Sequence, residues 1–337
     1  MISIIMQTYP IVSGISIIIP NYNGRLLLQE ILPCALKAAE NAGVPYEIIV
    51  CDDSSTDDSV YFLRQQYPGI KVFSNDLNRG FSPTINTGIF NASYSHVLLL
   101  NSDMKLCDTY FNSLFRYFER PDTFGVMGRI VGWDNDKVLD GGKVPAFHGV
   151  KIKTSINYLP VEKSGSAWLY SMYLSGANAF VDKQKIIELG GFDELFAPFY
   201  VEDYELSLRA WRMGWKCYYD DNAVCRHKHA ASIKASNSKE RIKVLHYRNK
   251  MYLHAIHLSQ PQRFLWFVQL FMESVMYLLI FRMRWFKSLN LFIRNYSGVV
   301  ESRKRLNSVA KGKHLRSVNE VADLVNATIR STTVTRF

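Results

Sequence analysis

Acidic residues stand at three places where carboxylates could bind a ligand or accept a proton. Asp52 and Asp53 follow one run of apolar residues, and Asp103 follows another. Glu202 and Asp203 come later, between a Gly-Gly turn and a pair of histidines. The first two places lie just after buried-type strands, where an open α/β sheet binds its ligand. This order favours a site for a metal ion, a nucleotide and a catalytic base over a solvated acidic surface.

Asp103 forms an oxygen-rich tripeptide with Asn101 and Ser102. Divalent cations prefer oxygen ligands and often keep positions open for phosphate oxygens. A departing nucleoside diphosphate needs such a cation, because negative charge builds up as the bond breaks. Asp103 or Ser102 could instead cap the segment that follows. The tripeptide alone therefore does not decide between a metal site and a cap.

Two further segments offer groups that suit a nucleotide. One carboxylate of residues 52–57 can accept a hydrogen bond from a base or a ribose, although residues 54–57 also suit a helix start. Arg79, beside the flexible Gly80, could bind a phosphate in bidentate fashion. Residues 20–24, Pro-Asn-Tyr-Asn-Gly, form the predicted turn after the first strand.

Apolar periodicity predicts the elements that hold these residues in place. Strands and helices alternate at the spacing of βαβ units, which indicates a mostly parallel sheet with helices on both faces. Residues 129–175 are irregular and suit a substrate-side insertion. The predicted strands are 15–20, 47–51, 71–74, 97–100, 175–181 and 216–219, and the predicted helices are 26–42, 59–67, 83–92, 110–119, 183–189 and 202–213.

Composition indicates a globular chain with an uneven distribution of charge. The 337 residues are 48% hydrophobic and 21% charged, which suffices to fill a core. Residues 1–225 hold 19 Lys and Arg against 25 Asp and Glu, whereas residues 226–337 hold 21 against 5. The basic excess in the C-terminal third suggests an anionic partner, either lipid or nucleic acid.

The cysteines and the N-terminus favour a cytoplasmic protein. Five cysteines are an odd number at no metal-like spacing, so we expect reduced and mostly buried thiols. Residues 1–12 are apolar but short and lack a charged leader, so we expect no signal peptide.

The segment 261–310 combines apolar and basic residues in a way that suits amphipathic helices. Residues 263–281 are almost long enough to span a bilayer, but Gln269, Glu273 and Ser274 interrupt them. Basic residues then alternate with Trp and Phe up to residue 294, which is typical of a helix in the membrane interface. A helical hairpin packed on the catalytic domain or across a homodimer, and a true span, are the alternatives. We expect the polar, basic tail 311–337 to be partly disordered.

Six motifs in register resemble glycosyltransferase family 2, which has the GT-A fold, and most closely its rhamnosyltransferase-like branch. The resemblance covers about residues 14–260, with the nucleotide-binding half at 14–105 and the acceptor half at 106–260. The motifs are SIIIPNYN at 16–23, DDSSTD at 52–57, NRGF at 78–81, LNSD at 100–103, GGFDE at 190–194 and the acid pair at 202–203.

The resemblance implies a role for each matching residue of the nucleotide site. Pro20, Tyr22 and Asp52 would line the nucleobase pocket, with Asp52 accepting the pyrimidine N–H. Arg79 and Asn101 would lie near the ribose or diphosphate. The remaining nucleotide-site candidates are Asn23 and Ser102.

The resemblance also implies a site for Mn²⁺ or Mg²⁺. Asp103 matches the last acid of the family's Asp-x-Asp motif, whereas Asn101 replaces the first. This departure leaves the metal site poorer in charge and makes another ligand more necessary. His227 is the first candidate, because residues 227–232 (HKHAAS) resemble the family's His-x-Gly-Gly-Ala-Ser segment, and His229 is the second. An anionic surface is the alternative partner for both histidines.

On the acceptor side, Asp203 aligns with the family's general base. An inverting transfer needs one carboxylate to take the proton of the acceptor hydroxyl. Glu202 would face another way, toward the acceptor, although acids in a first helical turn are also favoured by the helix dipole. Candidate sugar or acceptor contacts are Gly176, Ala177 and Trp168, with Trp133, Tyr170 and Tyr173 as further aromatic candidates.

The sequence therefore predicts a metal-dependent, inverting glycosyltransferase that builds bacterial surface polysaccharide. The expected donor is a UDP- or dTDP-sugar, and the acceptor a glycan or a lipid-linked molecule. We expect a peripheral protein on the inner face of the cell membrane, attached through 261–294, and no nucleic-acid partner. A nucleotidyltransferase is the alternative enzyme, although residues 20–24 lack its Gly-rich, Lys-containing loop. A nucleic-acid binder that uses the basic C-terminal third is the non-catalytic alternative.

Overall fold

Strands and helices alternate in the N-terminal part of the computed structural model, which describes residues 12–161, 168–228 and 238–337. β1 pairs in parallel with β2 and β4, and β2 pairs in parallel with β3. This alternation confirms the predicted βαβ pattern. The elements are β1 (Ile15–Asn21), α1 (Arg25–Asn41), β2 (Tyr46–Asp52), α2 (Ser59–Gln66), β3 (Lys71–Ser74), α3 (Phe81–Asn91) and β4 (His96–Leu100).

Strands of both directions complete the sheet. They are β5 (Met104–Leu106), β6 (Thr123–Gly132), β7 (Val138–Asp140), β10 (Leu169–Tyr170), β11 (Asn178–Asp182) and β12 (Lys216–His227). The sheet runs in the order β10-β12-β6-β11-β4-β1-β2-β3, with β5 beside β12 and β7 beside β6. β11 is antiparallel to both of its neighbours, whereas β6 and β12 are parallel to each other. The result is the expected α/β fold with a largely parallel central sheet.

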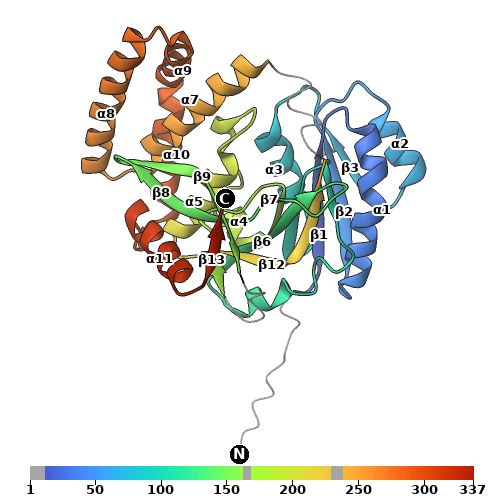
Figure 1. Ribbon diagram of the computed structural model, residues 1–337. Helices are drawn as coiled ribbons and strands as arrows, with labels where there is room; N and C mark the ends of the chain where they lie inside the picture. The colour runs from blue at the N-terminus through green and yellow to red at the C-terminus, as the bar shows by residue number, and fades with distance from the viewer. Residues whose placement is uncertain (1–11, 162–167, 229–237) are drawn as a thin grey trace, which may run out of the picture.

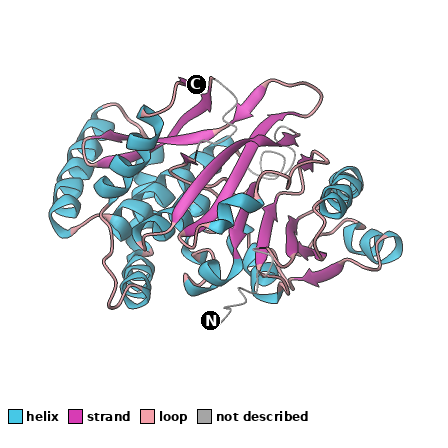
Figure 2. Ribbon diagram, turned by 90° about the horizontal axis from the view of Figure 1, so that it is seen from below, coloured by secondary structure: helices cyan, strands magenta, loops and turns pink. Residues whose placement is uncertain are grey.

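Helices cover both faces of this sheet (Figure 2). Apolar residues of α1 and α2 fill the core on one face. Apolar residues of α3, of α4 (Lys183–Glu188) and of α5 (Glu202–Arg212) fill the core on the other. Because the central strands are buried on both sides, they consist of almost unbroken apolar runs.

The segment 129–175 is more regular than its sequence indicates. β8 (Gly142–His148) and β9 (Lys151–Pro160) form an antiparallel hairpin, the β8–β9 hairpin. β13 (Val334–Arg336), near the C-terminus, adds a third strand beside β9.

The predicted helix at 110–119 is wrong. The backbone there makes successive turns with hydrogen bonds between residues three apart, and only 115–119 form a 3₁₀ helix, η1 (Phe115–Glu119). Aromatic packing explains the difference. Phe111, Phe115 and Phe118 all pack against Phe180 of β11, and this tertiary contact overrides the helical propensity of the segment. A second 3₁₀ helix, η2 (Glu194–Phe196), lies before α5.

The C-terminal third is helical. Its helices are α7 (Lys239–His257), α8 (Gln260–Leu279), α9 (Met283–Arg294), α10 (Tyr296–Val309) and α11 (Val318–Arg330). The expectation of a partly disordered tail at 311–337 is wrong. α11 buries Val318, Val321, Val325 and Ile329 in the main core, and β13 joins the β8–β9 hairpin. The apolar residues of α11 recur every three or four positions, which is the amphipathic pattern of a packed helix.

α8 and α9 form an antiparallel pair, the α8–α9 hairpin, that projects at the upper left of Figure 1, away from the central sheet. α9 packs on α7 through Trp285 and Phe292, which contact Tyr247 and Tyr252. None of the helices in the described ranges is both long and apolar enough to cross a membrane.

Candidate functional site

The carboxyl ends of β1, β2 and β4 meet at one edge of the sheet. Asn21 at the end of β1 pairs with Asp52 at the end of β2, and Ile18 pairs with Leu99 of β4. The parallel register therefore brings the residues that follow these strands to one place, although they are far apart in sequence. Asp52 and Asp103, which were expected to share a site, both belong to this edge.

Asp52 is buried, with 2% of its surface exposed, and it organises the turn that follows β2. Its Oδ1 accepts hydrogen bonds from Asn21 Nδ2 at 2.8 Å and from Ser55 Oγ at 2.6 Å, and its Oδ2 accepts one from the Ser55 N–H. Asn23 Oδ1 accepts the Thr56 N–H at 2.7 Å. Asp52 thus links the turns that follow β1 and β2. The two other base-pocket candidates, Pro20 in β1 and Tyr22 just after it, are half-buried.

Asp53, to which sequence reasoning gave no role, fixes the neighbouring loop. Its carboxylate accepts the backbone N–H groups of Arg79 and Gly80, each at 2.8 Å, and the side-chain amide of Asn75 at 2.9 Å. The second acid of the Asp-Asp pair was the available signal. The Arg79 guanidinium, expected near the ribose or diphosphate, forms a half-exposed ion pair with Glu194 at 3.1 Å.

The structure brings Asp103 and His227 together. β5 pairs with β12, and the Lys228 N–H donates to the Asp103 carbonyl at 3.0 Å. His227 Nε2 lies 3.3 Å from Asp103 Oδ2. Asp103 Oδ1 is buried and accepts no hydrogen bond from the described residues.

These two side chains fit a divalent cation that takes its other ligands from phosphate oxygens and water. The described ranges contain no group of three His, Cys, Asp or Glu that could hold a metal ion without such help. The second-choice ligand, His229, lies outside the described residues.

Backbone contacts connect Asp203 to the same edge of the sheet. The Gly176 N–H donates to Asp203 Oδ2 at 3.4 Å, and the Asn101 N–H donates to the Ala177 carbonyl at 3.2 Å. Gly176 and Ala177 thus lie between the acid of α5 and the residues that follow β4. Ser102, next to Asn101, is buried.

Asp203 and Glu202 differ in their surroundings. Burial raises the pKa of Asp203, while the N–H groups of Tyr204 and Gly176 and the charge of Lys143 lower it. Glu202 is 8% exposed, and its Oε2 has no hydrogen-bond partner among the described residues. Burial and then the neighbouring Asp203 raise the pKa of Glu202 well above its ordinary value. Burial therefore disfavours the charged form of both acids, and it does so more strongly at Glu202, which lacks the N–H donors that stabilise the Asp203 carboxylate.

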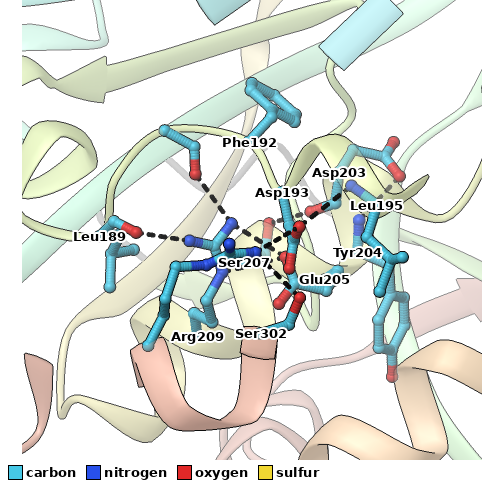
Figure 3. Close-up of polar contacts among 12 residues, drawn as sticks. Leu189, Phe192, Asp193, Leu195, Asp203, Tyr204, Glu205, Ser207, Arg209 and Ser302 are labelled. Carbon is cyan, nitrogen blue, oxygen red and sulfur yellow. Dashed lines mark hydrogen bonds and ion pairs between the residues drawn. The ribbon is translucent and has the colours of Figure 1, made fainter. Parts of the chain in front are cut away.

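A third acid of the same helix is structural. Glu205 Oε2 accepts from the Arg209 Nε–H at 2.9 Å, and Glu205 Oε1 lies 3.2 Å from His257 Nε2. Arg209 also donates to the carbonyls of Leu189 and Gly191, at 2.7 and 2.8 Å. Figure 3 shows the Asp203 carboxylate pointing away from this ion pair. The Glu205–Arg209 ion pair attaches α5 to the Gly-Gly turn, and Asp203 takes no part in it.

Among the aromatic candidates, Trp168 is not brought to the other site residues. Its ring packs against Tyr117 and Tyr218, on the face of the sheet opposite to α5, and the Arg120 guanidinium lies 4.0 Å from its centroid. Tyr173 lies nearer to the acids, because its ring packs against that of Tyr204 in α5.

Comparisons with known proteins agree with this fold. Residues 16–175 match the sequence model of glycosyl transferase family 2. Chondroitin synthase of Escherichia coli is 26% identical over 248 residues, which cover 64% of this chain and 35% of that protein. Undecaprenyl-phosphate 4-deoxy-4-formamido-L-arabinose transferase of Edwardsiella ictaluri (strain 93-146) is 32% identical over 104 residues, 30% of this chain and 32% of that protein. The chain thus spans about a third of the length of these relatives.

A solved structure has a similar fold. The crystal structure of GalNAc-T7 with UDP, GalNAc and Mn²⁺ superposes with a TM-score of 0.65 at 14% identity, over 95% of this chain and 58% of that one. The segment matched by the family model includes Asp52 and Asp103 but ends before Asp203 and His227. The chain is thus similar to glycosyl transferase family 2 over residues 16–175, which include the strand ends that carry the first two acids.

Proposed function

We propose that the protein is an inverting, metal-dependent glycosyltransferase of the rhamnosyltransferase-like branch. It would move a sugar from a UDP- or dTDP-linked donor to a hydroxyl of a glycan or lipid-linked acceptor in bacterial surface polysaccharide synthesis. The names of the two relatives, a chondroitin synthase and an undecaprenyl-phosphate transferase, support these classes of acceptor. The proposal depends mainly on the placement of Asp203 against Gly176, beside the strand ends that hold Asp52 and Asp103.

In the proposed step, the acceptor oxygen attacks the anomeric carbon of the donor sugar while its proton passes to Asp203. The bond from the anomeric carbon to the diphosphate oxygen breaks, and its electron pair leaves with the nucleoside diphosphate. One displacement inverts the anomeric configuration. Asp203 suits the role of base better than Glu202, because two backbone N–H groups stabilise its anion whereas Glu202 Oε2 has no partner among the described residues.

The donor would bind at the ends of β1, β2 and β4. Tyr22 and Pro20 would contact the base beside Asp52, and Arg79 would exchange Glu194 for a phosphate oxygen. Asp103 and His227 would hold Mn²⁺ or Mg²⁺, with phosphate oxygens completing its coordination. The bound cation would stabilise the negative charge of the leaving diphosphate.

We further propose that the α8–α9 hairpin lies in the interface of an anionic membrane on the cytoplasmic side. A helix packed on a soluble protein exposes a polar face. α8 instead buries only a narrow stripe around Trp266 and Leu270 and exposes apolar side chains over the rest of its surface. These exposed side chains continue around the turn into α9: Phe264, Leu265, Phe267, Val268, Phe271, Met272, Val275, Met276, Leu278, Leu279, Ile280, Phe281 and Met283.

The charges of the hairpin favour lipid over a second copy of the chain. Residues 264–281 contain one charged residue, Glu273, and it pairs with Lys151 of β9. Phe281 at the tip is 85% exposed, and the exposed Arg282 and Arg284 follow it. Apolar side chains beside arginines suit acyl chains beneath anionic headgroups, whereas two equally basic faces would repel each other.

The first prediction concerns the base. Asp203→Asn should lower kcat by about 10²- to 10⁴-fold, the usual contribution of a general base, and leave UDP or dTDP binding unchanged. Single-turnover assays with donor and acceptor, together with calorimetry of nucleotide binding, measure the two effects. Asp323→Asn, an exposed acid of α11, is the control. Normal turnover by the Asp203→Asn variant would exclude Asp203 as the base.

The second prediction concerns pH. Asp203 acts only when ionised, so activity should fall as the pH drops through its raised pKa. Lys143→Gln removes a positive charge that lowers this pKa, so the acidic limb of the kcat/KM profile should move to higher pH. Lys287→Gln, in an exposed ion pair with Glu240, should leave the limb in place. A shift to lower pH in Lys143→Gln would contradict the assignment.

The third prediction concerns the metal. A chelator should abolish transfer, and added Mn²⁺ or Mg²⁺ should restore it. Asp103→Ala should weaken Mn²⁺ binding in the presence of UDP by at least about tenfold, and His227→Ala should also weaken it. Electron paramagnetic resonance of free Mn²⁺ measures binding independently of activity. Full transfer in chelator would contradict metal dependence.

The fourth prediction concerns the membrane. The protein should sediment with phosphatidylglycerol vesicles and only weakly with phosphatidylcholine vesicles, and high salt should reduce binding. Phe271→Ser together with Phe281→Ser should remove most of the binding, whereas Phe90→Ser, an exposed phenylalanine of α3, should not. Light scattering gives the oligomeric state of each variant. A dimer that needs both hairpin phenylalanines and ignores vesicles would replace this proposal with dimerisation.

A further inference from the structure

The segment that leads into α5 has an unfavourable backbone conformation. Tyr200 and Val201 have φ angles of 75° and 74°, in the left-handed region that non-glycine residues rarely adopt. For the β-branched Val201 the strain is steric, and such a conformation persists only where the surrounding structure imposes it. The next two residues are Glu202 and Asp203, so this turn sets the direction in which α5 begins and in which these two side chains point.

Asn249 of α7 holds the turn. Its side chain is fully buried, and its Nδ2 donates to the carbonyls of Phe196, Phe199 and Tyr200 at 2.7, 3.1 and 2.8 Å. The Arg248 Nε–H donates to Asn249 Oδ1 at 2.9 Å, which keeps the amide nitrogen directed at the loop.

The other side of the loop contacts the nucleotide half of the site. The Pro198 carbonyl accepts the Phe81 N–H at 2.9 Å, and a side chain at Gly80 would overlap Pro198. Gly80 is in turn held by Asp53 at the end of β2. The loop before α5 is therefore fixed between two anchors, of which Asn249 is the one that acts on the left-handed residues.

We propose that Asn249 is a positioning residue, whose carboxamide holds residues 196–200 so that α5 presents Asp203 to the acceptor hydroxyl. This inference rests on the proposed function of Asp203. Without the amide, three carbonyls lose a donor and the turn can relax toward negative φ. A shift of the base by about 1 Å can cost about 10²-fold in rate, because proton transfer requires close alignment.

The test compares Asn249→Ala with a matched variant at Arg303 of α10, which contacts the C-terminal end of α7. Arg303 Nη1 also donates to three carbonyls, those of Ala255, Ile256 and Leu258, at 3.2, 3.0 and 3.0 Å. Arg303→Met should therefore destabilise α7 without affecting the loop before α5. Tm, kcat, donor KM and UDP binding are measured for both variants of the full chain.

Asn249→Ala should lower kcat by about 10²-fold and leave donor KM and UDP affinity nearly unchanged. Arg303→Met should show a similar decrease in Tm but the same kcat as the parent. If Asn249→Ala does not fold, Asn249→Ser, which keeps one donor, should show a smaller loss of kcat. A kcat within twofold of the parent in a folded Asn249 variant would overturn the inference. So would an equal loss of kcat in Arg303→Met.

A double variant separates this inference from the function on which it rests. In the Asp203→Asn background, Asn249→Ala should cause little further loss, because the base that it positions is already absent. If Asp203→Asn is itself fully active, the proposed base is wrong. If Asp203→Asn is inactive while the folded Asn249→Ala variant has the kcat of the parent, Asp203 remains the proposed base and only the positioning role of Asn249 is wrong.

Discussion

The parallel pairing of β1, β2 and β4 is the constraint on which the site depends. A parallel strand can rejoin its neighbour only through a crossover connection, so each strand ends at the same edge and each is followed by a turn there. Polar residues in those turns are separated by tens of positions in sequence but meet in space. The apolar runs of the strands set this arrangement, because they must be covered by helices on both faces. The strand order therefore brings the acids of the site together, and the loops that follow the strands carry the reactive side chains.

Within this arrangement, the surroundings give similar carboxylates different roles. Asp52 and Asp53 are satisfied by short hydrogen bonds and hold the turns in shape. Glu205 forms an ion pair with Arg209, which attaches the helix to a neighbouring turn, and lies within hydrogen-bond distance of His257. Burial raises the pKa of both Glu202 and Asp203, but two peptide N–H groups stabilise the carboxylate of Asp203 alone. A catalytic assignment therefore follows from the partners of each acid more than from its place in a motif.

The periodicity of apolar residues predicted the N-terminal half of the fold. The pairing of β5 with β12 explains why Asp103 and His227, which were expected to share a metal, lie close together. Prediction failed where distant contacts decide the structure. Residues 110–119 pack as 3₁₀ turns against Phe180, and the tail folds because α11 finds an apolar surface supplied by the rest of the chain. Asn249 left no sequence signal, because its partners are backbone carbonyls and any residue can provide those. The positive φ angles that make it important occur at Tyr and Val, which local rules would place elsewhere.

α7 joins the two surfaces that the proposed reaction needs. Asn249 on this helix reaches the loop before the base, and Tyr247 two residues earlier packs on Trp285 of the α8–α9 hairpin. A second connection runs from Gln269 of α8 to the tip of the β8–β9 hairpin, whose first strand carries Lys143 toward Asp203. Both connections are made of packed, regular elements, and packed interiors transmit displacement instead of absorbing it. A hairpin seated in a membrane interface would therefore fix the orientation of Asp203 relative to the bilayer. The reacting hydroxyl of a lipid-linked acceptor would lie at a fixed distance from the same membrane surface. It would then approach Asp203 in one orientation, because the membrane fixes the orientation of both molecules.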